Sequence, residues 1–279
     1  MVMTKEIIIE MNIKAINALK KTNRRIFYNV CRSVSLIKNV KLDTQILVGT
    51  HHKSGTYWLN KIFRWLSLYE GFKFYSGLKE DLPRNYDIFF QNKSHFGDEV
   101  LSLNYKGLHM IRDPRDIIVS GCFYHQRANE PWLHIKQSKF NGLTYQEKIN
   151  SYDTLDDKIA FEMKNTAFQC IKDMLAWDYD NHKFFEIKYE DLLQDSNLFL
   201  FHRIFTFLGI PSKVIPKALQ IAHKHSIFSG IPKMKGHIRS GRARQWEKYF
   251  NKNNKRLFVD IYGDALVVLD YERNNDWIL

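Results

Sequence analysis

The chain has 279 residues, 44% of them hydrophobic, which is enough to bury an extensive core, and we expect one large α/β domain. Forty-two Lys and Arg against 30 Asp and Glu give a formal net charge of +12, which indicates a polyanionic partner: nucleic acid, an anionic membrane or a multiply phosphorylated cofactor. Three scattered cysteines, Cys31, Cys122 and Cys170, exclude a disulfide framework and a zinc site, so we expect a cytoplasmic protein.

The first 42 residues are expected to form a basic helical extension that precedes the main domain at residues 43–279. Their apolar run is interrupted by Glu10 and Lys14 and has no small-residue cleavage site, so it does not read as a secretory signal. No run approaches the roughly 18 apolar residues of a membrane span. A surface helix and a peripheral membrane contact both fit this segment, and the first is favoured.

Residues 46–58, ILVGTHHKSGTYW, predict a strand, a tight loop and the start of a helix. The apolar run at 46–48 ends in a glycine, and apolar residues recur at helical spacing from Tyr57 to Gly71. Backbone N–H groups and the positive end of a helix dipole therefore meet Lys53, which predicts a phosphate or sulfate site. The order of residues excludes a Walker A loop, in which lysine follows the second glycine; a helix N-terminus with an exposed lysine is the structural alternative.

A second strand is predicted at residues 87–91 and is followed by Lys93, Ser94 and His95. In an open parallel sheet the carboxyl ends of the strands are where ligands bind. One histidine among the 11 in the sequence is more often structural than catalytic, so its position alone assigns no role to His95.

A third strand, at residues 108–111, leads directly to Arg112. Asp113 is predicted to cap the next helix, which places Ser120 about two helical turns further along. A guanidinium fork and a hydroxyl are suitable phosphate ligands, so Arg112 and Ser120 predict a second anion site. The alternative is that Arg112 pairs only with Asp113 or Asp116.

These motifs resemble those of the cytosolic-type sulfotransferases, whose phosphosulfate loop is close to PKSGTTW. The matching residues of the loop are Lys53, Ser54, Gly55, Thr56 and Trp58. His52 replaces the proline of that motif, and Tyr57 replaces its second threonine. The Lys-Ser-His segment is similar to the KTH segment of the family, and the eight-residue spacing from Arg112 to Ser120 is that of its 3′-phosphate site.

Later segments resemble the same family. The string YEDL begins at Tyr189, and Ser226-Ile227-Phe228 stands where the family has a Ser/Thr-x-Phe beside the adenine. Arg239-Ser240-Gly241 occupies the place of an Arg-Lys-Gly that grips the 3′-phosphate, with Trp246 seven residues past its arginine. Ser240 replaces the lysine of that motif and so removes one positive charge. Arg242 or Arg244 is the candidate to supply it.

The resemblance implies a single α/β domain with a central parallel sheet flanked by helices and a P-loop-like phosphosulfate-binding loop. It also implies transfer of a sulfuryl group from 3′-phosphoadenosine 5′-phosphosulfate (PAPS) to a hydroxyl or amine of a small molecule. His95 would then be the base, Lys53 would neutralise the leaving phosphate oxygen and Lys93 the transferring group. The implied contacts to PAPS and its product 3′,5′-ADP are Lys53, Ser54, Gly55, Thr56, Tyr57, Trp58, Arg112, Ser120, Tyr189, Ser226, Phe228, Arg239, Ser240 and Gly241.

Residues 126–157 show no clear periodic element and predict a long, loop-rich insertion, which in the resembled family borders the acceptor pocket. An acidic cluster stands out near its end, consisting of Asp153, Asp156, Asp157 and Glu162. It is read as a solvated helix start, with a site for a cationic acceptor such as a natural product as the alternative. Longer helices are predicted at residues 158–180 and 256–269, with a strand at 184–187 between them.

Two other classes of protein remain as alternatives. A P-loop-like nucleotide kinase would bind ATP with Mg²⁺, and a basic nucleic-acid-binding protein would need stacking aromatics along a basic face. No carboxylates are arranged like a Mg²⁺ site, so no metal is predicted, and neither a nucleic-acid partner nor a transmembrane segment is expected. The family's C-terminal dimer motif has no clear counterpart, which leaves the oligomeric state open.

Overall fold

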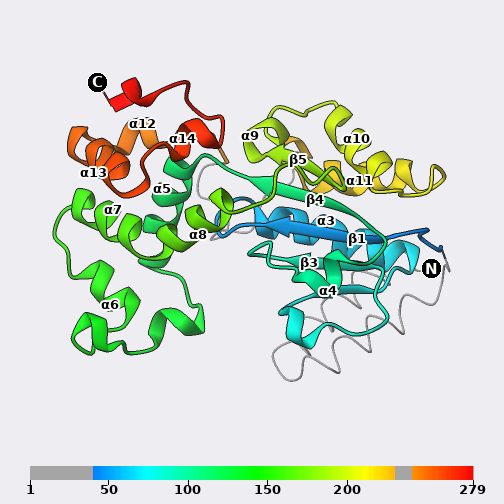
Figure 1. The fold of residues 1–279 in the computed structure, drawn as a ribbon, viewed down its shortest axis with the longest axis horizontal. Helices are drawn as coiled ribbons and strands as arrows, with labels where there is room; N and C mark the ends of the chain where they lie inside the picture. The colour runs from blue at the N-terminus through cyan, green and yellow to red at the C-terminus, as the bar shows by residue number, and fades with distance from the viewer. Residues whose placement is uncertain (1–39, 230–240, 279) are drawn as a thin grey trace, which may run out of the picture.

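A computed structural model describes residues 40–229 and 241–278 and has a five-stranded sheet at its centre (Figure 1). The strand order is β2-β3-β1-β4-β5, and every neighbouring pair is parallel. The strands are β1 Gln45–Thr50, β2 Phe74–Ser76, β3 Ile88–Gln91, β4 Tyr105–Ile111 and β5 Phe184–Lys188. The predicted α/β fold with a central parallel sheet is confirmed, whereas the expected extension over residues 1–42 lies almost wholly outside the described residues.

The register of the central strands aligns their carboxyl ends. Gly49 of β1 lies opposite Gln91 of β3, and Thr50 lies opposite Met110 of β4. β1, β3 and β4 are covered on both faces, which is why they read as nearly continuous apolar runs in the sequence. The segments that follow these three strands therefore leave the sheet at the same edge.

Helices cover the sheet and extend beyond that edge. The α-helices are α3 Thr56–Glu70, α4 Asp98–Leu101, α5 Pro114–His125, α6 Tyr145–Asn150, α7 Leu155–Lys164, α8 Thr166–Leu175, α9 Tyr189–Leu192, α10 Phe199–Phe207, α11 Ile215–His225, α12 Trp246–Tyr249, α13 Lys252–Tyr262 and α14 Ala265–Val268. The 3-10 turns are η2 Lys79–Asp81, η3 Pro131–His134, η4 Ser138–Phe140, η5 Ile227–Ser229 and η6 Asn275–Ile278. Among these described helices, none is both long and apolar enough to cross a membrane.

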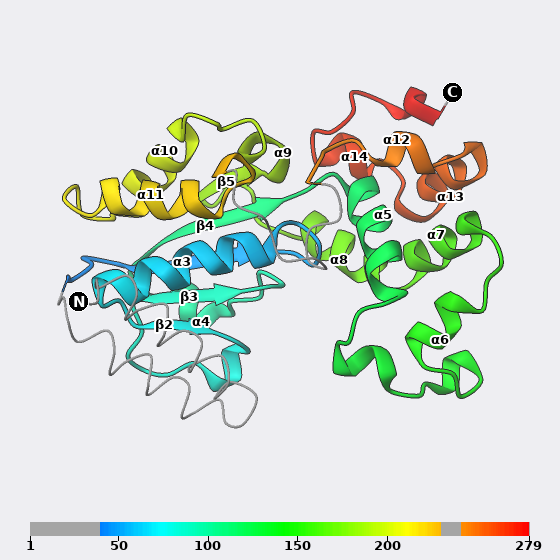
Figure 2. The same ribbon diagram turned by 180° about the vertical axis from the view of Figure 1, so that it is seen from behind.

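The core has two main parts, which Figures 1 and 2 show side by side. In the first, α3, α10 and α11 pack on one face of the sheet, with Phe63 of α3 edge-on to Phe205 of α10. In the second, α5 to α8 and α12 to α14 form a helical layer with its own core, which includes Trp246 and Phe258. Because only the short turn of Arg112 and Asp113 separates β4 from α5, the helical layer begins at the edge where the strands end.

The structure corrects the expectation for residues 126–157. The segment is not loop-rich throughout but contains η3, η4, α6 and the start of α7. A capping box fixes the start of α6: the Thr144 hydroxyl accepts from the Glu147 N–H, and the Glu147 carboxylate accepts from the Thr144 N–H. These helical segments are too short for a periodic apolar pattern, and their caps are the only local signal.

Two predicted helices are each broken into two. The helix expected at residues 158–180 is α7 followed by α8, interrupted at Asn165, whose φ of −124° and ψ of −104° are not helical. The helix expected at 256–269 is α13 followed by α14, interrupted at Gly263 with a φ of +56°. In both places the apolar pattern continues across the break, because both helices of each pair face the same core.

Close packing between β4 and β5 makes Gly107 sensitive to substitution. A Cβ on Gly107 would lie 2.2 Å from the ring of Phe184, a buried side chain of β5. We expect Gly107→Ala to lower the free energy of unfolding by about 1–3 kcal/mol through overpacking. Thermal unfolding followed by circular dichroism would measure it, as a fall in Tm of roughly 2–4 °C per kcal/mol.

Gly77→Ala is the matched control, because its added Cβ would meet only the distal end of the Tyr75 side chain, a group that can move. We expect this variant to keep nearly the full Tm. Equal stability of the two variants would contradict the close approach of β4 to Phe184.

Candidate active site

The loop between β1 and α3 is closed by side chains of its own. The Ser54 hydroxyl accepts from the His51 N–H at 2.9 Å and donates to the His51 carbonyl at 2.8 Å. The Thr56 hydroxyl also donates to the His51 carbonyl, at 2.8 Å. These two hydroxyls therefore shape the loop at the N-terminus of α3, where the helix dipole and backbone N–H groups favour an anion.

Gly55 is required by the path of this loop. It is the N-cap of α3 and has a φ of +96°, a left-handed conformation that side chains rarely adopt. A Cβ there would lie 2.8 Å from the ring of Tyr189 and 3.0 Å from Met110. The glycine thus lets the loop approach both β4 and the end of β5.

Lys53 places a partly buried ammonium beside Tyr124. Its Nζ lies 3.4 Å from the centre of the Tyr124 ring, and no carboxylate of the described residues forms an ion pair with it. Burial, together with the nearby charge of Arg112, lowers the pKa of Lys53 to about 8, while Glu130 and Glu162 act in the opposite direction. A desolvated cation without a counter-ion is an anion-binding group.

Arg112 links the two predicted anion sites. Its buried guanidinium donates to the Lys53 carbonyl at 2.9 Å and lies 4.6 Å above the Tyr189 ring. The sequence left open that Arg112 pairs only with Asp113 or Asp116. Arg112 does contact Asp116, at 3.4 Å, whereas Asp113 pairs with Arg115. The Arg112 Nε is buried and has no partner among the described residues, so it has a donor left for a ligand.

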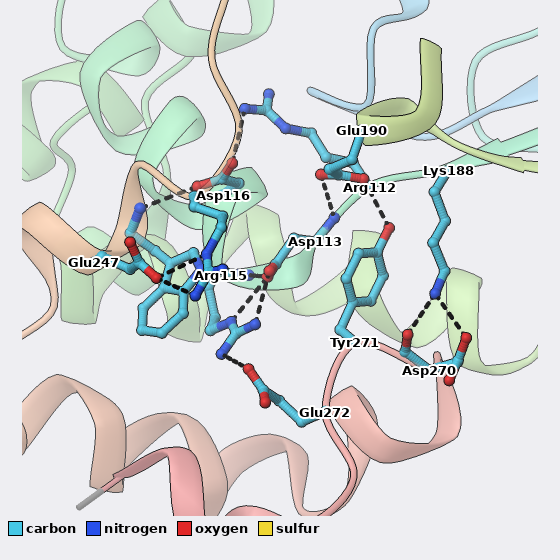
Figure 3. Close-up of polar contacts among 12 residues, drawn as sticks. Arg112, Asp113, Arg115, Asp116, Lys188, Glu190, Glu247, Asp270, Tyr271 and Glu272 are labelled. Atoms are coloured by element: carbon cyan, nitrogen blue, oxygen red, sulfur yellow. Dashed lines mark hydrogen bonds and ion pairs between the residues drawn. The ribbon is translucent and has the colours of Figure 1, made fainter. Parts of the chain in front are cut away.

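The turn that carries Arg112 is fixed from the C-terminal part of the chain (Figure 3). The Arg115 guanidinium pairs with Asp113 at 2.8 Å and with Glu272 at 2.5 Å, and it lies 3.8 Å above the Trp246 ring. The Trp246 N–H in turn donates to Asp116 at 3.0 Å. These bonds hold the start of α5 against residues more than 100 positions later.

Two of the three aromatic residues predicted to hold the adenine, Trp58 and Tyr189, are in contact. Trp58 meets Tyr189 edge-on, with ring centres 6.1 Å apart, and its Nε1 is buried without a partner among the described residues. The Ser226 hydroxyl donates to the His223 carbonyl at 2.8 Å and accepts from the Phe228 N–H at 3.1 Å. Ser226 therefore shapes the turn that presents the half-buried Phe228.

The other residues predicted to contact PAPS differ in how exposed they are. Ser120 and Gly241 are partly exposed, and Tyr57 is 47% exposed. Arg239 and Ser240 lie outside the described residues, so their predicted contacts to the 3′-phosphate stay predictions.

The loop after β3 is tied to the loop after β1. The Ser94 hydroxyl donates to the Thr50 carbonyl at 3.1 Å, which fixes the residue between Lys93 and His95. His95 is 56% exposed, and its Nε2 lies 3.4 Å from a carboxylate oxygen of Asp173 on α8. Lys93 is exposed as well, so both predicted catalytic side chains of this loop are accessible to a ligand.

Sequence reasoning missed a set of buried polar partners around the loop. His52 shares a hydrogen bond with His125, which contacts Glu162 on α7. Tyr124, under the Lys53 ammonium, donates to Glu130 at 2.7 Å. The only local signal was His52 itself, a polar ring in the motif position where proline is usual.

The acidic cluster has structural partners. Asp157 accepts from Thr154, the N-cap of α7, and Asp156 accepts from Asn251 and Asn254. Glu162 is buried and bonded to His125 rather than exposed at a helix start. These contacts favour the structural reading of the cluster, and in the described ranges no group of three or more His, Cys, Asp or Glu could hold a metal ion.

A parallel sheet whose strands bring an ammonium, a guanidinium and a histidine to one edge, beside a helix N-terminus, defines a group transferase with an anionic donor. The family model of the sulfotransferase domain matches residues 43–269. The chain belongs to this family, and it is a PAPS-dependent sulfotransferase, as the motifs predicted.

Similar proteins agree with this assignment. A 3-alpha-hydroxysteroid sulfotransferase of Cavia porcellus is 23% identical over 288 residues, which span 86% of this chain and 91% of the relative. Sulfotransferase 2A1 of Rattus norvegicus is 23% identical over 284 residues, covering 85% and 88% of the two chains. The crystal structure of mouse sulfotransferase SULT7A1 complexed with PAP has the same fold, with a TM-score of 0.57, 15% identity and coverage of 86% of this chain and 93% of that one.

The lowered pKa of Lys53 predicts how donor binding depends on pH. Below about pH 8 the ammonium is charged and attracts the 5′-phosphate, whereas above it the charge is lost. The Kd for 3′,5′-ADP, measured by calorimetry from pH 7 to 9.5, should be constant at first and then rise beyond about pH 8.

Lys53→Arg is the matched variant, because a guanidinium stays protonated over this whole range. We expect its Kd to show no bend near pH 8. A bend that persists in Lys53→Arg would assign the titration to another group.

Proposed function

We propose that sulfuryl transfer takes place at the edge of the sheet where β3, β1 and β4 end, with Lys53 at the reacting group. The observation that carries this proposal is the Lys53 ammonium, partly buried over Tyr124 without a carboxylate partner among the described residues. Such a charge is costly to leave unpaired, so an anionic ligand at this position would stabilise it.

The donor site is proposed to bind the two ends of a doubly phosphorylated adenosine. The N–H groups at the start of α3 would hold the 5′-phosphate, while Arg112 and Ser120, with Arg239 and Gly241, would hold the 3′-phosphate. Trp58, Tyr189 and Phe228 would pack against the adenine. The buried Arg112 Nε and Trp58 Nε1 support this fit, because each is a donor that lacks a partner in the described part of the chain.

The chemistry needs charge stabilisation and positioning more than covalent catalysis, as in phosphoryl transfer. Bound PAPS supplies an activated sulfuryl group whose leaving group is a phosphate. Lys53 stabilises charge on the leaving oxygen, and Lys93 faces the transferring group. His95 accepts the proton of the acceptor, a task that suits an imidazole near neutral pH.

The acceptor is proposed to be a small molecule with a hydroxyl or an amine. The name of the guinea-pig relative, a hydroxysteroid sulfotransferase, supports a hydroxyl. Cys122 and Cys170 are buried and form no disulfide with one another, which is compatible with the reducing cytoplasm that we propose as the location. Neither a nucleic-acid partner nor a resident metal forms part of the proposal.

His95→Ala should lower kcat by about 10²-fold or more, because the acceptor loses its proton-accepting partner. The Kd for 3′,5′-ADP should stay unchanged, since His95 is proposed to face the acceptor rather than the donor. Turnover can be followed as the mass gain of one SO₃ group across an acceptor library. Normal turnover by His95→Ala would assign the base to another residue.

Arg112→Ala should weaken 3′,5′-ADP binding by about 10- to 100-fold, the range for a charged hydrogen bond. Arg112→Lys should restore little of the affinity, because an ammonium lacks the planar fork. Arg203→Ala, which removes an exposed arginine of α10, is the control for the change in net charge. Equal Kd values for Arg112→Ala and Arg203→Ala would exclude Arg112 from the donor site.

A further inference from the structure

A buried chain of hydrogen bonds runs from the phosphosulfate loop to α7. His52 Nε2 lies 3.0 Å from His125 Nε2, and His125 Nδ1 lies 2.8 Å from Glu162 Oε2. The Tyr145 hydroxyl donates to the same Glu162 oxygen at 2.8 Å. The side chains of His125 and Glu162 are 0% and 1% exposed, so water does not compete for these bonds.

The geometry of the two rings assigns their protons. The planes of His52 and His125 differ by 7°, with ring centres 5.1 Å apart, so the in-plane Nε2 atoms point at one another. Because the Glu162 carboxylate accepts a bond, His125 carries its proton on Nδ1 and accepts at Nε2. His52 then donates from Nε2, and its Nδ1 keeps a lone pair.

We propose that His52 is a second proton acceptor for sulfuryl transfer, oriented by His125 and Glu162. The proposal rests on the proposed function of the Lys53 site. The proton of the acceptor moves to His52 Nδ1 as the oxygen or nitrogen that carried it bonds to sulfur. The bond from sulfur to the 5′-phosphate oxygen breaks, and its electron pair stays on that oxygen.

His52 lies among the residues proposed for catalysis. It directly precedes Lys53 in the loop, and its ring meets Tyr124, which lies under the Lys53 ammonium. The Cys170 thiol donates to the His52 carbonyl at 3.4 Å, which fixes the backbone from α8. His52 is partly exposed, so its Nδ1 edge is the one left for a substrate.

Burial and the charges around His52 keep it neutral before a donor binds, and they also weaken it as a base. Burial lowers the pKa of His52 well below its usual value, and the charges of His125, Lys53 and Lys93 lower it further. A bound anionic donor offsets the two lysine charges, so it raises the basicity of His52 when transfer is due. The other titratable groups around the chain are Tyr124, Glu130, Tyr145, Glu162 and Cys170.

A second chain of the same composition provides a matched control. His51 Nε2 lies 2.8 Å from His109 Nε2, and His109 Nδ1 contacts Glu186 on β5. His51 is only 1% exposed, and its Nδ1 is buried without a partner in the described part of the chain. His51, at the end of this chain, is buried, whereas His52, at the corresponding end of the other chain, is partly exposed. The chain through His51 therefore cannot take a proton from a substrate.

The first test reads the protons directly and needs no acceptor. In the full chain saturated with 3′,5′-ADP, ¹⁵N NMR of the histidine rings should show His52 protonated at Nε2 and bare at Nδ1. Binding of 3′,5′-ADP should raise the proton affinity of His52 by about tenfold. His125→Asn, which keeps a donor for Glu162 but offers His52 no acceptor, should abolish the tautomer preference. A proton on Nδ1 of His52 in the wild type would overturn the proposal.

The second test uses 2-naphthol and androsterone as acceptors. The double variant His52→Gln with His95→Ala should be about 10²-fold slower than His95→Ala alone. His125→Asn should shift the pH profile of kcat/KM, whereas His109→Asn should lower Tm and leave the profile in place. A double variant as fast as His95→Ala overturns the role of His52. Failure of the wild type to bind 3′,5′-ADP would instead overturn the proposed donor site.

Discussion

The hydrogen bond from the Arg112 guanidinium to the Lys53 carbonyl, 2.9 Å long, is the constraint on which the rest of the site depends. It joins the loop after β1 to the turn after β4, two neighbouring strands of the sheet. Arg112 is buried, and its contact with Asp116 is long at 3.4 Å, so its charge is only partly neutralised inside the protein. The two cations proposed to bind the ends of the donor are thus held in fixed relation before any ligand binds, which would lower the entropic cost of binding.

The sequence revealed the parts of the site that depend on local rules. Buried parallel strands appear in the sequence as short apolar runs. The loop before α3 needs a residue that tolerates positive φ, and Gly55 supplies it. The strands and the loop could therefore be predicted from the sequence. Partners that meet only through tertiary packing were not visible. His125 lies 73 residues from His52, and Glu162 is 37 further on, with no periodic pattern to connect them. Glu162 was accordingly grouped with its acidic neighbours, although it is buried.

The two His-His-Glu chains show that composition alone does not decide the role of a polar network. Burial lowers the pKa of His109 to about 3 and raises that of Glu186 to about 8, so the closed chain is stable as a neutral unit under the sheet edge. Trp177, stacked on His109 at 4.0 Å and bonded to Glu186, completes that unit. The chain through His52 differs at the end of the chain, where His52 is partly exposed and is proposed to face the ligand. The exposure of the terminal histidine, rather than the types of side chain in the network, distinguishes a structural network from one proposed for catalysis.

The contacts around Arg115 extend the active site to the far end of the chain. Its guanidinium lies against the rings of both Trp246 and Trp277 and is neutralised by Asp113 and Glu272. A premature stop codon after residue 270 would delete one ring and one carboxylate around Arg115 while keeping every residue proposed to bind a phosphate. The shortened polypeptide should still form its sheet but bind the nucleotide weakly. A screen for expression would not detect this defect, whereas weak retention on a column of immobilised 3′,5′-ADP would.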